Sequence, residues 1–159
     1  MVYRKTKYVE EKLADTRKKI LKSARALVSE GGWGEAQISN VAASAGVYIG
    51  SVYRYFPSKA DLFVEVLLSV SQREVDVLIT IIQEQDSPIT RLQIAVATFA
   101  KRAMRNRRLA YAMIAEPCDK EINAARLVYR HAISKHVMEI IIQGQKTGDF
   151  RPDISADIA

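Results

Sequence analysis

The side chains best suited to chemistry in this 159-residue chain lie between Gln37 and Lys59. Arg54 can make a bidentate contact with the edge of a guanine, and Ile49 can touch the methyl group of a thymine. Lys59 carries a mobile positive charge that suits a phosphate group. Hydroxyl groups that can hydrogen-bond to phosphate oxygens are present on Ser51, Tyr53 and Tyr55. These residue types predict contacts with a nucleic acid.

A helix-turn-helix would place these side chains on one surface. Apolar residues fall at helical spacing on a short helix over 38–45, namely Ile38, Val41, Ala42 and Ala45. A tight turn follows at 45–47, and Pro57 ends a further helix over 48–55 because the residue before a proline avoids helical geometry. We expect Val47 and Val52 to face the core, which leaves outward Tyr48, Ile49, Gly50, Ser51 and Arg54. An ordinary helical corner would show the same periodicity.

The positive charge of the chain is concentrated in its first third. The formal net charge is +6, and residues 1–59 hold eleven Lys or Arg against five Asp or Glu. Residues 60–159 hold thirteen of each and are therefore neutral. A basic end on a neutral body is typical of proteins that bind nucleic acid or an anionic membrane, although a solvated basic surface would look the same. An arm or helix start that follows a nucleic-acid backbone could include Arg4, Lys5, Lys7, Arg17 and Lys18.

The remaining segments also show helical periodicity, so the sequence predicts an all-α fold. A first helix carries the apolar face of residues 13–28 and ends at Gly31-Gly32. Ser58 and Asp61 form a capping box that starts a long helix over 60–85. Three more helices are expected over 89–105, 108–115 and 119–145. Pro88 lies in the turn before the first of them, and Pro117 lies in the turn before the third.

The segment AGVYIGSVYRYFPSKADLF, residues 45–63, resembles the signature of the TetR family of bacterial transcription regulators. The matching positions are Gly46, Val47, Gly50, Ser51, Tyr53, Tyr55, Phe56, Ser58, Lys59 and Leu62, with Ile20, Leu21, Ala24 and Leu27 upstream. The resemblance covers residues 16–67, and the order of seven helices fits the same family. It implies a three-helix DNA-binding module followed by an antiparallel helical domain for ligand binding and dimerisation.

The resemblance also implies which residues contact DNA. The family uses the residues that match Tyr53 and Lys59 for phosphate contacts, and Gly50 would let the backbone approach DNA closely. The sequence departs from the family pattern at Gln37, where a threonine or serine usually caps the second helix, and at Tyr48, where a small polar residue usually stands. The predicted DNA-binding residues are Gln37, Ser39, Tyr48, Ile49, Gly50, Ser51, Tyr53, Arg54, Tyr55 and Lys59.

The later helices resemble the walls of the family's ligand pocket. The predicted pocket residues are Phe99, Tyr111, Met113, Arg126, Tyr129 and Arg130. Each of them could instead belong to the core or the surface. We expect two or three of them to line a cavity.

Other residue patterns do not support catalysis, a cofactor or a metal. The chain has no glycine-rich nucleotide-binding loop, and Lys146-Thr147-Gly148 reads as a helix-ending turn. His131 and His136 are five residues apart, which puts them on different faces of a helix. Cys118, the single cysteine, is expected to be an unreactive loop residue that fits a reducing cytoplasm.

The sequence therefore predicts a DNA-binding domain over 1–58 and a ligand-sensing domain over 59–159. We expect a cytoplasmic transcriptional repressor that is released from double-stranded operator DNA by a small-molecule effector and uses no cofactor, metal or membrane. The family usually continues into two further helices that form a dimer interface. We thus expect the chain to lack its last dimerisation helices and the complete protein to be a homodimer. The alternatives are an architectural DNA-binding protein without a sensor, and an enzyme with a fortuitous helix-turn-helix.

Overall fold

The computed structural model describes residues 7–158, and this part of the chain folds into seven α-helices without a strand. The helices are α1 (Lys7–Glu35), α2 (Ile38–Ala45), α3 (Ile49–Tyr55), α4 (Lys59–Ile82), α5 (Pro88–Arg105), α6 (Arg107–Ile114) and α7 (Lys120–Thr147). The predicted all-α fold is confirmed. Arg4 and Lys5 lie outside the described residues, as does the side chain of Lys7. None of the described helices is long and apolar enough to cross a membrane.

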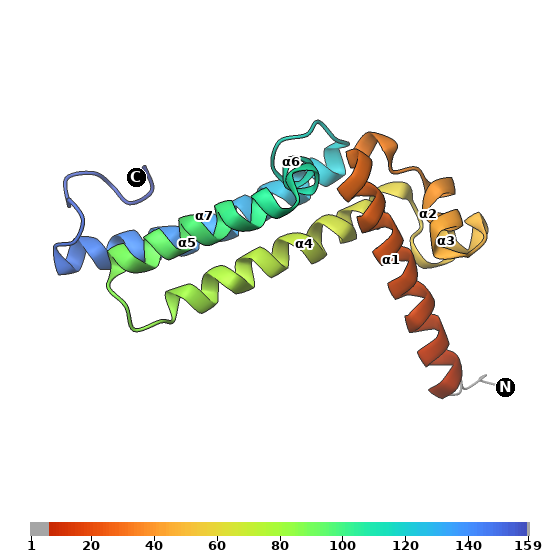
Figure 1. Ribbon diagram of the computed structural model, residues 1–159, viewed down its shortest axis with the longest axis horizontal. Coiled ribbons are helices and arrows are strands. Elements are labelled where there is room, and N and C mark those ends of the chain that lie inside the picture. Colours follow the sequence, from red (N-terminus) through yellow and green to blue (C-terminus); the bar gives the residue numbers. More distant parts are fainter. Residues whose placement is uncertain (1–6, 159) are drawn as a thin grey trace.

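The molecule is elongated, with its first three helices at one end (Figure 1). α4 starts among these helices and runs away from them, with α5 and α7 packed beside it along its length. α6 is short and packs against α1, so it lies where the two groups of helices meet. One hydrophobic core extends from α1, α2 and α3 into α4, α6 and α7, and includes Ile20, Val52, Leu67, Ala112 and Ile122.

α1 is interrupted at Gly32, where the backbone is not helical, so the helix end predicted at Gly31-Gly32 is confirmed. Gly32 has a φ of 77°, a conformation that side chains with a Cβ adopt only at a cost. A short helical segment that the sequence did not predict follows the kink and ends at Glu35. The kink turns this segment so that Trp33 is buried against Phe63, with the two rings edge to face and their centroids 5.9 Å apart.

The turn between α2 and α3 has the geometry of a helix-turn-helix. Gly46 has a φ of 68° and its backbone N–H donates to the carbonyls of Ala42 and Ala43, which ends α2. Val41 and Val52 are fully buried and hold the two helices against the core. Phe56 is also buried, while Tyr53 is 46% exposed.

α4 begins at the predicted capping box. The Ser58 side chain accepts a hydrogen bond from the backbone N–H of Asp61 at 3.0 Å and donates one to the Asp61 carboxylate at 2.7 Å. The helix ends at Ile82, three residues before the predicted end. Ser87 and Asn106 cap α5 and α6 in the same way, because the side chain of each accepts the N–H of the third residue that follows it.

Gly32 and Gly46, which both have a positive φ, allow a test of the kink. A Cβ on Gly32 would overlap the Arg108 guanidinium and the Glu116 carboxylate, whereas a Cβ on Gly46 would meet no atom. We expect Gly46→Ala to lower the free energy of unfolding by about 1 kcal/mol, which is backbone strain alone. Gly32→Ala should cost at least about twice as much, because strain and the displaced Arg108 add. If urea unfolding gives the same loss of unfolding free energy for both variants, the packing of Arg108 and Glu116 against the kink is not important for stability.

Candidate nucleic-acid interface and internal cavity

α3 and the residues around it present an exposed face without acidic side chains. Tyr48 is 88% exposed, and Ile49 and Tyr53 are each about half exposed. Gly50, Arg54 and Ser39 are also exposed, whereas Ser51 is half-buried. No Asp or Glu occurs between Gln37 and Lys59, so nothing within this segment would repel a phosphate.

The remaining predicted interface residues lie beside this face. Gln37 is the N-cap residue of α2, but its side chain donates to the carbonyl of Gly34 at 2.9 Å instead of capping the helix. Tyr55 is half-buried under the guanidinium of Arg54, which lies 5.4 Å from its ring centroid. Lys59 opens α4, and its Nζ lies 5.8 Å from the ring of Phe63. The charge of Lys59 is therefore placed at the junction of α3 and α4.

Arg17 ties α1 to α4 beneath this interface. Its guanidinium is paired with the Glu65 carboxylate and lies over the ring of Phe56, 4.8 Å from the ring centroid. These contacts give Arg17 a structural role within the protein, and its place in an arm that follows a nucleic-acid backbone stays a prediction. The pairing holds α1 and the first turns of α4 in a fixed relation.

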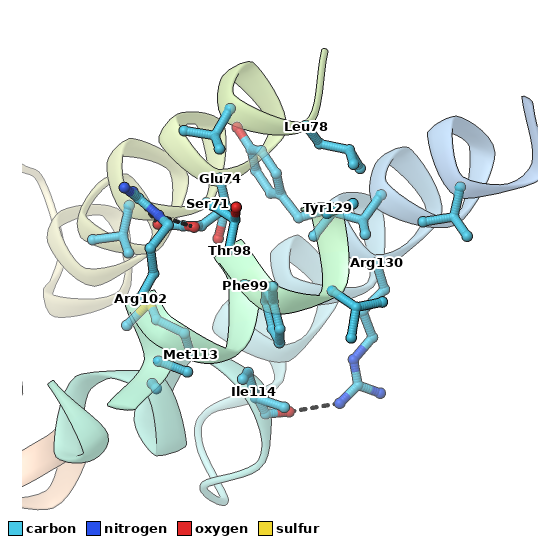
Figure 2. Close-up of a pocket in the computed structure, with 18 of the residues that line it drawn as sticks. Ser71, Glu74, Leu78, Thr98, Phe99, Arg102, Met113, Ile114, Tyr129 and Arg130 are labelled. Carbon is cyan, nitrogen blue, oxygen red and sulfur yellow. Dashed lines mark hydrogen bonds and ion pairs between the residues drawn. The ribbon is translucent and has the colours of Figure 1, made fainter. Parts of the chain in front are cut away.

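A largely apolar cavity of about 530 Å³ lies among α4, α5, α6 and α7 (Figure 2). This volume is within the range of binding sites for small molecules. The residues that α4 contributes include Val70, Val77, Leu78 and Ile81. Of the predicted pocket residues, the cavity wall includes Phe99, Met113, Arg126, Tyr129 and Arg130.

Tyr111, the sixth predicted pocket residue, is not part of the cavity wall. It is 51% exposed and its ring lies under the guanidinium of Arg108, 5.6 Å from the centroid. The difference arises from the short α6, on which Met113 and Tyr111 are two positions apart and so point to different sides.

Charged side chains occur at two places on the cavity wall. Arg102 and Glu74 form a bidentate pair with two contacts of 2.7 Å, and this pairing raises the pKa of Arg102 above its ordinary value. Arg130 donates to the carbonyl of Ile114 at 2.6 Å. Figure 2 shows the two groups on opposite sides of Phe99. No local pattern in the sequence indicated the pairing of Glu74 with Arg102, because the two residues are 28 positions apart on different helices.

A buried hydrogen-bond network joins α1, α6 and α7 next to the cavity. The Trp33 indole Nε1–H donates to the carbonyl of Ala112 at 2.8 Å, and Arg126 donates to the same carbonyl at 3.1 Å. Arg108 donates to the carbonyl of Gly31 at 2.7 Å and to the Glu116 carboxylate. Arg126 on the cavity wall is thus connected to the end of α1 through the carbonyl of Ala112.

The cysteine and the histidines form no reactive cluster. Burial raises the pKa of the Cys118 thiol, which disfavours the nucleophilic thiolate. His136 lies 3.2 Å from the Glu139 carboxylate. Residues 7–158 contain no group of three or more His, Cys, Asp or Glu side chains arranged to hold a metal ion.

Comparison with known proteins places the first helices in a family. Residues 20–66 match the family model described as "Bacterial regulatory proteins, tetR family". This stretch contains the helix-turn-helix and the start of α4, so the resemblance carried by the 45–63 signature is confirmed.

Curated relatives match the same part of the chain. The HTH-type transcriptional repressor KstR of Rhodococcus jostii is 44% identical over 59 residues, which is 37% of this chain and 28% of that protein. KstR of Mycobacterium tuberculosis is 45% identical over 53 residues, or 33% of this chain and 24% of that protein. The matches thus span about a quarter of the length of these relatives.

Solved structures match most of the chain in fold. The transcriptional regulator FadR of Bacillus subtilis, solved in complex with stearoyl-CoA, has a TM-score of 0.77 at 18% identity and matches 89% of this chain and 77% of that one. The fatty acid degradation regulator FadR of Bacillus halodurans has a TM-score of 0.75 at 22% identity, with the same coverage. At these identities the likeness shows that α4–α7 adopt the fold of such regulators.

Proposed function

We propose that this protein is a sequence-specific transcriptional regulator, a repressor that a small molecule releases from its operator DNA. The observation that carries the proposal is the course of α4. Its first residue, Lys59, lies beside the exposed face of α3, and its later turns form one wall of the apolar cavity. One rigid element therefore connects the two candidate sites.

The contacts proposed for DNA follow from the chemistry of the exposed face. Lys59 and the hydroxyls of Tyr53 and Tyr55 would bind phosphates and fix the position of α3 in the major groove. Arg54 and Ile49 would contact base edges and so provide sequence preference. The KstR relatives, which match this region, are named as transcriptional repressors.

The cavity supports a sensor over the alternative of an architectural DNA-binding protein. Such a protein needs no apolar cavity, whereas here α4, α5, α6 and α7 line one. The FadR of Bacillus subtilis, which shares the fold, was solved with stearoyl-CoA. For this chain we propose a small, largely apolar effector in the cavity.

The proposed switch uses α4 as a lever. The helix has 24 residues and is therefore about 36 Å long. In a homodimer the two copies of α3 must sit about 34–36 Å apart to enter successive major grooves. A molecule wedged among α4–α7 would tilt α4 and change that spacing. We propose that the regulator acts as a cytoplasmic homodimer and carries out no catalysis.

The DNA contacts can be separated by two variants. Operator duplexes selected from a random pool should bind with an affinity that falls steeply with salt, because phosphate contacts release counterions. Lys59→Ala should weaken binding to all sequences alike and flatten the salt dependence, whereas Arg54→Ala should reduce discrimination at one base pair by about 1–3 kcal/mol. Lys120→Ala, on an exposed residue at the start of α7, is the control. If Lys59→Ala and Arg54→Ala both bind the operator like wild type, the interface is wrongly assigned.

The cavity can be tested with a matched pair of methionines. Met113 lines the cavity, whereas Met104 is 60% exposed and does not. We expect Met113→Trp to weaken binding of Nile red, an uncharged apolar dye, about tenfold or more, because the added rings occupy the space that the dye needs. Met104→Trp should bind the dye like wild type, and both variants should keep their operator affinity. Equal dye binding by the two variants would argue against an internal ligand site.

A further inference from the structure

Arg126 is a buried cation on the cavity wall. It lies on α7, is 7% exposed and lines the cavity. Its Nη2 donates to the carbonyls of Ala112 at 3.1 Å and Glu116 at 2.8 Å and to the Cys118 sulfur at 3.1 Å, and its Nη1 lies 3.4 Å from the Asn123 side-chain oxygen. All four acceptors are uncharged groups. The Nε of Arg126 is buried and has no hydrogen-bond partner within residues 7–158.

Two carboxylates near the cavity, those of Glu116 and Glu74, are engaged with other arginines. The Glu116 side chain accepts two hydrogen bonds from Arg108, at 2.6 and 3.1 Å, and one from the backbone N–H of Trp33 at 3.3 Å. Glu74, across the cavity, is paired with Arg102 through both of its oxygens. No ion pair to Arg126 is present in the described part of the chain.

A guanidinium in this position is stable only at a cost. Arginine stays protonated in proteins, so it cannot shed its charge when it is buried. Hydrogen bonds to neutral carbonyls compensate part of the lost hydration, but a buried charge without a counter-charge remains unfavourable. The cavity wall carries three arginines and one glutamate, and that glutamate neutralises Arg102. The cavity therefore has an excess of positive charge, held by Arg126 and Arg130.

We propose that the ligand of this cavity is an anionic amphiphile, with an apolar body among α4–α7 and a carboxylate that pairs with Arg126. The apolar wall, to which Phe99, Ile133 and Val137 contribute, would bury the body of the ligand. The carboxylate would pair with the guanidinium of Arg126 on the cavity wall and supply the missing negative charge. The inference rests on the proposed function only in taking the cavity as the effector site.

Two probes that differ only in their head group test the inference. Decanoate and decanol share one alkyl chain, and isothermal titration calorimetry gives the affinity of the protein for each. We expect decanoate to bind about tenfold or more tightly than decanol, which is the effect of one charge-assisted hydrogen bond. Arg126→Met, which replaces the cation by an apolar chain of similar length, should abolish this preference while leaving the affinity for decanol within about threefold.

Arg91 provides a matched control. It is also 7% exposed, has a buried Nε without a partner among the described residues, and donates to the Ile82 carbonyl at 2.7 Å and the Gln143 side chain at 2.6 Å. Arg91 is not on the cavity wall, so Arg91→Met should keep the preference for decanoate. Equal affinities of wild type for the two probes, or no binding of either, would overturn the inference. A preference that persists in Arg126→Met would overturn it as well.

If Arg126→Met fails to fold, the wild-type comparison still tests the ligand class, because equal affinities for decanoate and decanol overturn it. Its outcome is also separate from that of the proposed function, because calorimetry is done without DNA. Preferential binding of decanoate that leaves operator affinity unchanged would support the ligand class and count against release by that ligand. The opposite pattern, release of the operator by decanol as readily as by decanoate, would count against the ligand class alone.

Discussion

The arrangement of the molecule depends on one buried carbonyl, that of Ala112. A carbonyl oxygen has two lone pairs, and here one receives the Trp33 indole N–H and the other the Arg126 guanidinium. The indole belongs to α1 and the guanidinium to α7, so three helices meet at one atom of α6. Because the site is buried, a donor that leaves it must find another acceptor or stay unsatisfied. The position of α1 is therefore linked to the state of the cavity wall.

A second contact joins α1 to α4 near the helix-turn-helix. Arg17 on α1 pairs with Glu65 on α4 and covers the ring of Phe56. α1 is thus attached to α4 near the helix-turn-helix and to α6 at its kinked end, where Arg108 binds the carbonyl of Gly31. These two attachments couple α1 to both α4 and α6. Because α1 packs against α2, and α2 packs against α3, a shift of α4 or α6 should reach α3. This is the physical basis of the proposed switch.

The sequence was sufficient where local chemistry determines the structure. The glycine turn at Gly46, the capping box at Ser58 and the inward position of Val52 follow from neighbours within a few residues, and all were predicted correctly. Helix ends with weaker local signals shifted, as at Ile82 on α4. The break at Gly32 was predicted but the short helical segment after it was not, because contacts that hold the kink come from Arg108, 77 residues from Gly31.

The two candidate sites also differ in how far the sequence could predict them. The exposed face of α3 lies within one continuous segment, so its residues could be named from spacing. The cavity is built from four helices, and its polar groups depend on pairs such as Glu74 and Arg102, which no local pattern connects. Tyr111 was misplaced because its side of α6 is set by the packing of that short helix against α1.

The most direct test of the account is the reciprocity between the two sites. Linkage requires that decanoate weaken operator binding by the same factor by which the operator weakens decanoate binding. We predict a common factor of roughly 5–150, measured as the operator Kd with and without saturating decanoate and the decanoate Kd with and without operator. If decanoate occupies the cavity while the operator Kd stays the same, the two sites are not coupled and the account of a ligand-released repressor is contradicted.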